Sequence, residues 1–228
     1  MKRNDIGHPP FIKVCGQTHP ASVDCAVAYG ARYVGFVFHA GSPRSVSPET
    51  VAAINTAHVG RVGVFVRQRA DEILPIMRQA RLDYAQLHGA QSTTDAKLID
   101  PMRVIRVLWP EQAGSLQALQ EQIDAWEPYC AAYLLDAGQL GQGGSGRRLA
   151  LAELGALRLP HPWILAGGLS AENLRDTLAQ CRPDGIDLNS GIEIAPGIKS
   201  ADKMLAAFTA VSSASSSVRE ALGRKQGI

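Results

Sequence analysis

Two side chains able to exchange protons end separate apolar runs of the sequence. Cys15 closes the run at residues 11–15, and Asp136 stands near the end of the run at residues 131–137. Side chains alternate between the faces of a strand, so Cys15 shares a face with Lys13, and Asp136 shares one with Leu134. A thiolate and a carboxylic acid can serve as base and acid in catalysis. Plainer interpretations stay open, with Cys15 as a small buried hydrophobe and Asp136 as a loop or helix cap.

Three glycine-rich turns follow the later apolar runs, at residues 139–146, 166–170 and 189–193. Glycine lets backbone amides approach a ligand closely, and such amides together with a helix N-terminus commonly hold phosphate. We therefore predict a small phosphorylated ligand, although glycines can also do no more than end strands. The residues singled out for ligand binding are Gly144, Gly167, Gly168, Ser190 and Gly191.

Two further polar side chains follow earlier runs. Arg44 lies in a loop rich in serine, proline and glycine at residues 39–48, where a guanidinium could hold a carboxylate through two hydrogen bonds. A solvated surface arginine is the simpler interpretation. His88 lies near the end of the run at residues 83–89 and is a further candidate for substrate contact. The four cysteines are far apart and form no Cys-x-x-Cys pair, so we expect neither a zinc site nor a disulfide framework.

The elements that must position these residues recur at intervals of about 20 to 30 residues. Between the apolar runs lie segments with helical spacing, two of which begin at the hydroxyl residues Ser47 and Ser170. Alternating strands and helices predict a single-domain (β/α)8 TIM barrel, with chemistry at the C-terminal ends of the strands. An open, doubly wound sheet is the alternative. The expected strands are residues 11–15, 32–38, 61–66, 83–89, 103–108, 131–137, 163–168 and 185–191.

One domain accounts for most of the chain. We expect an N-terminal extension at residues 1–10, a catalytic barrel at residues 11–210 and a flexible, serine-rich tail at residues 211–228, which begins as a frayed helix. The net charge is only +2 and the basic residues are scattered, which argues against a nucleic-acid partner. Neither a signal peptide nor an apolar run of membrane-spanning length is present, so we expect a cytoplasmic protein with no membrane partner.

Taken in order, the motifs closely resemble those of phosphoribosylanthranilate isomerases. The resemblance covers about residues 11–210 and implies a TIM barrel that catalyses an Amadori rearrangement in tryptophan biosynthesis, with no metal and no organic cofactor. The motifs that carry it are KVCG at 13–16, GFVF and SPRSVSP within 35–48, QLHG at 86–89, LLDA at 134–137, GGSG at 143–146, LAGGL at 165–169 and DLNSGIE at 187–193.

The resemblance also assigns roles. It makes Cys15 the general base and Asp136 the general acid, and it places Arg44 on the anthranilate carboxylate and the last two glycine-rich turns on the phosphate. The related isomerase of histidine biosynthesis has aspartate in both catalytic positions, so the cysteine favours the anthranilate substrate. This chain departs from the family at residues 147–150, where Arg-Arg-Leu-Ala replaces the usual Phe-Asp-Trp, and at Asn189, which replaces a serine.

These roles require unusual protonation. The acid must start protonated and the base must start as thiolate. With ordinary pKa values of about 8.5 for Cys and about 3.9 for Asp, only ~10⁻⁵ of molecules would hold both forms at pH 7. We expect burial to raise the pKa of Asp136 and a neighbouring cation to lower the pKa of Cys15. Lys13 is the candidate cation, with Asp187 as its expected hydrogen-bonded partner on the adjoining strand. A purely structural ion pair is the alternative.

Other functions remain open at this point. A paralogous phosphosugar isomerase could use the same barrel with a different substrate. A barrel that binds a phosphorylated ligand without catalysis belongs to another class, but it would not need a paired acid and base. A Schiff-base aldolase is disfavoured because Lys13 would lie too deep. We expect a monomer or a homodimer.

Overall fold

The apolar runs form a closed barrel of eight parallel strands in a computed structural model that describes residues 1, 8–138 and 151–225, with side chains described up to residue 214. Each strand pairs with the next, and β1 also pairs with β8, which closes the sheet. This confirms the predicted (β/α)8 barrel and excludes the open sheet. The strands are β1 (Phe11–Val14), β2 (Tyr33–Val37), β3 (Gly60–Phe65), β4 (Tyr84–Leu87), β5 (Val104–Leu108), β6 (Ala132–Asp136), β7 (Trp163–Ala166) and β8 (Gly185–Leu188).

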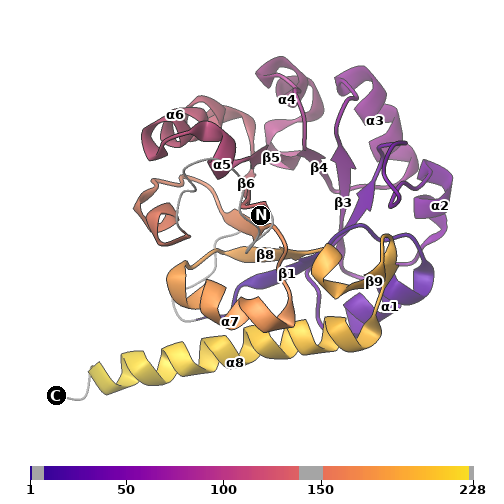
Figure 1. Ribbon diagram of the computed structural model, residues 1–228. Helices are drawn as coiled ribbons and strands as arrows, with labels where there is room; N and C mark the ends of the chain where they lie inside the picture. The colour runs from indigo at the N-terminus through magenta and orange to yellow at the C-terminus, as the bar shows by residue number, and fades with distance from the viewer. Residues whose placement is uncertain (2–7, 139–150, 226–228) are drawn as a thin grey trace.

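Helices surround the barrel (Figure 1). Two begin where the sequence predicted: the Ser47 hydroxyl accepts a hydrogen bond from the Thr50 N–H at 3.2 Å, and Ser170 forms a capping box with Asn173. The α-helices are α1 (Pro20–Ala28), α2 (Pro48–Ala53), α3 (Ala70–Gln79), α4 (Thr93–Ile99), α5 (Pro110–Ala113), α6 (Leu116–Trp126), α7 (Ala171–Gln180) and α8 (Ala201–Lys225). Short 3₁₀ helices are η1 (Pro101–Arg103), η2 (Glu127–Tyr129), η3 (Leu151–Ala156) and η4 (Ser190–Ile192).

Alternation along β1 divides its side chains between two layers. Ile12 and Val14 belong to the large apolar layer between the strands and the helices. Phe11 packs inside the barrel with residues such as Val62 and Ile164 from other strands. Near-continuous apolar strands are typical of a parallel sheet buried on both faces. The interior position of Phe11 confirms the predicted parity, by which Lys13 and Cys15 also face inward.

The last helix continues through the C-terminal segment and does not end at residue 210. Helix α8 extends to Lys225, lies beside α7 and projects past the barrel (Figure 1). Val211 is still buried in the core, so the predicted boundary falls inside the helix. The mobility expected for residues 211–228 stays a prediction. At the other terminus, the amino group of Met1 donates a hydrogen bond to the Tyr84 hydroxyl at 3.4 Å.

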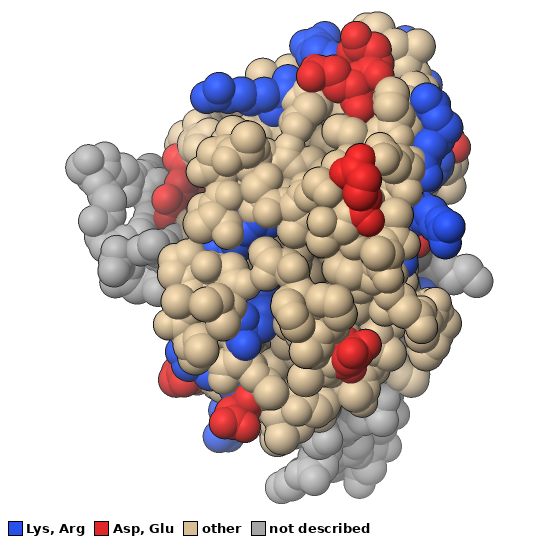
Figure 2. Space-filling model, turned by 90° about the vertical axis from the view of Figure 1, so that its right-hand side faces the viewer, with Lys and Arg blue, Asp and Glu red and all other residues tan. Residues whose placement is uncertain are grey.

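Basic and acidic side chains are interspersed on the side of the molecule seen in Figure 2. None of the described helices is both long enough and apolar enough to cross a membrane.

Candidate active site

A cavity of about 390 Å³ opens where the C-terminal ends of the strands meet. It brings together residues from seven strands or the loops that follow them, far apart in the sequence. Seven of the predicted site residues line it: Cys15, Arg44, His88, Asp136, Gly167, Gly168 and Ser190. Gly191 lies beside it in η4, and Gly144 falls outside the described residues, as do residues 147–150.

The floor of this cavity holds a buried ion pair. Lys13 is fully buried, and its ammonium donates a hydrogen bond to Asp187 Oδ2 at 2.8 Å, as predicted from the pairing of β1 with β8. A Cβ atom at Gly35 would lie 2.8 Å from Cys15 Sγ and 3.1 Å from Lys13 Nζ. Glycine in β2 therefore makes room for both groups, a role that the sequence analysis missed. A glycine inside a strand was the available signal, because it often marks close approach of other atoms.

The electrostatics of the floor correct one prediction. Burial lowers the pKa of Lys13, but Asp187 and Cys15 together outweigh this effect and hold the pKa above its ordinary value. Burial, followed by the charge of Asp187, raises the pKa of Cys15, and the opposing effects of Lys13 and Lys199 do not cancel these contributions. Lys13 lowers the pKa of Cys15 as expected, but desolvation of the thiol is the larger effect, so the net shift is opposite to the one predicted. The resting side chain is a thiol.

Asp136 enters the cavity at the end of β6. Its Oδ1 accepts a hydrogen bond from the backbone N–H of Gly138 at 3.1 Å, so the turn that follows the strand holds the carboxyl group in place. The loop-capping interpretation and the cavity position therefore both apply to the same side chain. One carboxyl oxygen binds the turn while the group faces the cavity that also contains Cys15.

Arg44 lines the cavity but already binds a protein carboxylate. Its Nε donates to Glu193 Oε1 at 2.9 Å and its Nη2 donates to Glu193 Oε2 at 2.6 Å. Lys199 donates to the same Oε1 at 2.8 Å. The sequence analysis predicted Arg44 at the site but missed Glu193 and Lys199. No local signal could have identified this pairing, because Glu193 lies 149 residues from Arg44.

The two turns predicted to bind phosphate, after β7 and β8, lie side by side at the cavity. Gly167 and Gly168 have φ angles of 111° and 57°, a region that favours glycine. A Cβ atom at Gly191 would lie 2.0 Å from the carbonyl oxygen of Leu169, so the turn after β8 packs directly on the turn after β7. Ser190 begins η4 and lines the cavity. Backbone amides in these turns could hold a phosphate group.

His88 contributes a neutral ring to the wall. It contacts Trp109 edge to face, with ring centroids 5.4 Å apart. Burial lowers the pKa of His88, so the imidazole is uncharged at neutral pH. Its position fits a contact with an uncharged part of a ligand.

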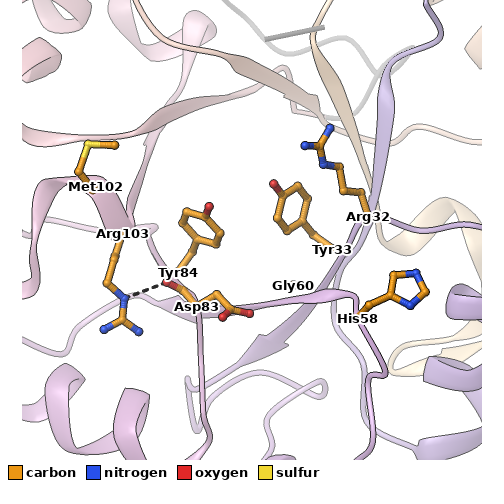
Figure 3. Close-up of a pocket in the computed structure, with 8 residues that line it drawn as sticks. All are labelled: Arg32, Tyr33, His58, Gly60, Asp83, Tyr84, Met102 and Arg103. Atoms are coloured by element: carbon orange, nitrogen blue, oxygen red, sulfur yellow. Dashed lines mark hydrogen bonds between the residues drawn. The ribbon is translucent and has the colours of Figure 1, made fainter. Parts of the chain in front are cut away.

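A second cavity, of about 450 Å³, lies at the opposite end of the barrel (Figure 3). Tyr33 and Tyr84 stand edge to face there, with ring centroids 5.8 Å apart, and Arg103 Nε donates to the carbonyl oxygen of Asp83 at 3.0 Å (Figure 3). Seven of the predicted site residues line the cavity at the C-terminal ends of the strands instead. Among the described residues, no group of three or more His, Cys, Asp or Glu side chains could hold a metal ion.

Comparison with known proteins identifies relatives along nearly the whole barrel. The family model described as N-(5'-phosphoribosyl)anthranilate (PRA) isomerase matches residues 12–210. A protein of that name from Desulfovibrio desulfuricans is 51% identical over 198 residues, which cover 87% of this chain and 93% of the relative.

Solved structures agree with this result. The crystal structure of a phosphoribosyl anthranilate isomerase from Thermus thermophilus has a TM-score of 0.74 and 38% identity, covering 89% of this chain and 98% of that one. Another phosphoribosyl anthranilate isomerase was solved in complex with reduced 1-(o-carboxyphenylamino)-1-deoxyribulose 5-phosphate. It has a TM-score of 0.75 and 27% identity, covering 90% of this chain and 99% of that one.

Proposed function

Because the chain belongs to the N-(5'-phosphoribosyl)anthranilate isomerase family, we propose that it catalyses the Amadori rearrangement of N-(5-phosphoribosyl)anthranilate to 1-(o-carboxyphenylamino)-1-deoxyribulose 5-phosphate. One observation carries the proposal: Cys15 and Asp136 line the same cavity, which also contains Arg44 and the glycine turn after β7. A barrel that only binds a phosphorylated ligand has no need of this acid and base. The proposed substrate and pathway support a cytoplasmic location, which we propose with them.

In this reaction Asp136 donates its proton to the ring oxygen of the aminoribose, and the bond between C1 and that oxygen breaks. The nitrogen lone pair forms a C1=N bond, which leaves a positively charged iminium. The Cys15 thiolate then removes the proton from C2, and the electron pair of that bond forms C1=C2 while the C=N electrons return to nitrogen. The resulting enolamine tautomerises to the aminoketose. Asp136 gives up one proton and Cys15 takes up one, so the total number of protons on the two groups is unchanged.

The remaining cavity residues hold the two ends of the substrate. Arg44 would contact the anthranilate carboxylate through the part of its guanidinium that faces the cavity. The amides near Gly167, Gly168, Ser190 and Gly191 would hold the phosphate, and His88 would contact the substrate as a neutral ring. Fixing both ends keeps the aminoribose between Cys15 and Asp136. Whether the enzyme acts as a monomer or a homodimer stays a prediction.

Turnover of the substrate tests the proposal. Phosphoribosylanthranilate is generated in situ, and loss of its anthranilate fluorescence is followed with the protein and with buffer alone, which measures spontaneous hydrolysis. We expect protein-dependent conversion to the aminoketose phosphate. Tight binding of the reduced product analogue without turnover would instead support a non-catalytic barrel. Absence of both turnover and binding would point to a paralogue with another phosphosugar substrate.

A further inference from the structure

The hairpin after β8 has an inverted pattern of burial. It consists of β9 (Glu193–Ala195) and β10 (Ile198–Lys199), which pair with each other and not with the barrel. Its apolar side chains Ile194 and Ile198 are 68% and 56% exposed, whereas the Glu193 and Lys199 side chains are 5% and 1% exposed. Burying two charged groups while exposing two isoleucines costs free energy, so the arrangement needs an explanation beyond core packing.

The buried carboxylate of Glu193 is surrounded by donors. Oε1 accepts hydrogen bonds from Arg44 Nε at 2.9 Å, from Lys199 Nζ at 2.8 Å and from the Gly197 N–H at 3.2 Å. Oε2 accepts from Arg44 Nη2 at 2.6 Å. Burial raises the pKa of Glu193, but the hydrogen bonds from Arg44 and Lys199 outweigh this and hold it below the ordinary value. The carboxylate is therefore ionised at neutral pH.

The resulting cluster has two cations and one anion. Arg44 and Lys199 together carry two positive charges, and Glu193 neutralises one of them. Arg44 is the member that lines the cavity, and its bidentate contact with Glu193 restrains the plane of the guanidinium. A restrained cation with an unbalanced charge beside a cavity is suited to binding a carboxylate.

Lys199 also connects the cluster to the turn after β8. Besides Glu193, its ammonium donates to the carbonyl oxygen of Asn189 at 3.1 Å and to Asn189 Oδ1 at 2.8 Å. Asn189 directly precedes Ser190, in the turn assigned to the phosphate. A Cβ atom at Gly16 would lie 2.7 Å from both Arg44 Cδ and Asn189 Oδ1, so the end of β1 closes on the same cluster.

We propose that Glu193 and Lys199 are positioning residues that fix Arg44 for the carboxylate of the substrate and set its place relative to the turn after β8. The inference rests on the proposed function and deepens it, because it assigns selectivity for carboxylated arylamine substrates to the β9–β10 hairpin. Neither residue contacts the reacting atoms. Both act through the orientation of Arg44.

Binding of two ligands distinguishes a positioning role of Glu193 and Lys199 from a purely structural one. The first is the reduced carboxyphenylamino-deoxyribulose phosphate, and the second is the same compound without its carboxyl group. Dissociation constants are measured by calorimetry for the wild-type chain and for Glu193→Asp, which keeps the charge but withdraws the carboxylate by one methylene. We expect this variant to bind the carboxylated ligand at least about tenfold more weakly and the other ligand within about twofold of wild type.

Two further variants complete the design. Lys199→Met should show the same selective loss. Lys203→Met is the matched control, because Lys203 is an exposed lysine that donates to the main-chain oxygen of Glu193 at 2.8 Å and does not contact its carboxylate. We expect this control to bind both ligands like wild type.

The outcomes are distinguishable. Equal weakening of both ligands in Glu193→Asp and Lys199→Met, or no weakening of either, would overturn the positioning role while leaving the proposed function intact. Wild-type protein that binds neither ligand would overturn the proposed function and this inference with it. Wild-type protein that binds both ligands equally would remove Arg44 from carboxylate recognition, and the positioning role would fall with it.

Discussion

At the scale of single residues, burial decides the chemistry of the cavity floor. The Cys15 thiol is desolvated beside the Asp187 carboxylate, and both effects favour the neutral form even though two ammonium groups lie nearby. Cys15 therefore rests as a thiol, and the thiolate that the proposed mechanism requires is its minor form.

The pH dependence of kcat/KM follows from this arrangement. The proposed mechanism needs one proton on the acid and base together, so activity falls once the Cys15 thiol ionises and no proton remains for the acid. Burial raises the pKa of Cys15 above its ordinary value of about 8.5. We expect kcat/KM to stay flat from neutral pH to about pH 9 and to fall only above it. Steady-state rates across this range check the prediction, with circular dichroism to verify that the fold persists. A decline centred below pH 8 would contradict it.

The buried pair at the floor predicts a stability difference. Lys13→Met leaves the Asp187 carboxylate buried without its partner and should lower the free energy of unfolding by about 3–5 kcal/mol. The exposed pair between Arg158 and Asp124 offers a control, since Arg158→Met should cost less than about 1 kcal/mol. Urea denaturation followed by circular dichroism measures both. Equal stability of the two variants would show that the buried pair contributes no more than the surface pair.

At the scale of elements, hydrophobic pattern and strand parity were sufficient to predict the strands and the contact between Lys13 and Asp187. Parity requires only the local order of residues, and closure of the barrel brings β1 beside β8. The contacts of Arg44 with Glu193 depend instead on how a loop and a distant hairpin meet, which no local pattern encodes. The pKa of Cys15 was predicted in the wrong direction because desolvation depends on packing from all sides.

The close contact between the glycine turns after β7 and β8 predicts an effect on phosphate binding. Gly191→Ala places a methyl group against the Leu169 carbonyl oxygen, so the turn must move away. We expect inorganic phosphate, measured as a competitive inhibitor, to bind at least about tenfold more weakly, or ~1.4 kcal/mol. Gly155→Ala is the control, because a Cβ atom there meets nothing within 4 Å and should leave the inhibition constant unchanged. Unchanged inhibition in Gly191→Ala would remove this turn from the phosphate site.

At the scale of the whole molecule, the two ends of the barrel carry different sets of residues. The end where the strands finish collects the thiol, the carboxyl group, the arginine and the glycine turns into one cavity. The resemblance recognised in the sequence predicted this distribution because its motifs fall at strand ends. A frayed helix was predicted in the serine-rich segment, but the full extent of α8 was not, since this sequence lacks the apolar periodicity that normally marks a helix.

The most direct test of the account is the turnover number of variants of the two residues proposed to exchange protons with the substrate. Cys15→Ala and Asp136→Asn should each lower kcat for phosphoribosylanthranilate by at least ~10². Because the two groups act as a pair, the double variant should lose little more than the worse single variant. Circular dichroism of each variant must match that of the wild type. Near-normal turnover in either single variant, with the fold intact, would contradict the account and remove that residue from the mechanism.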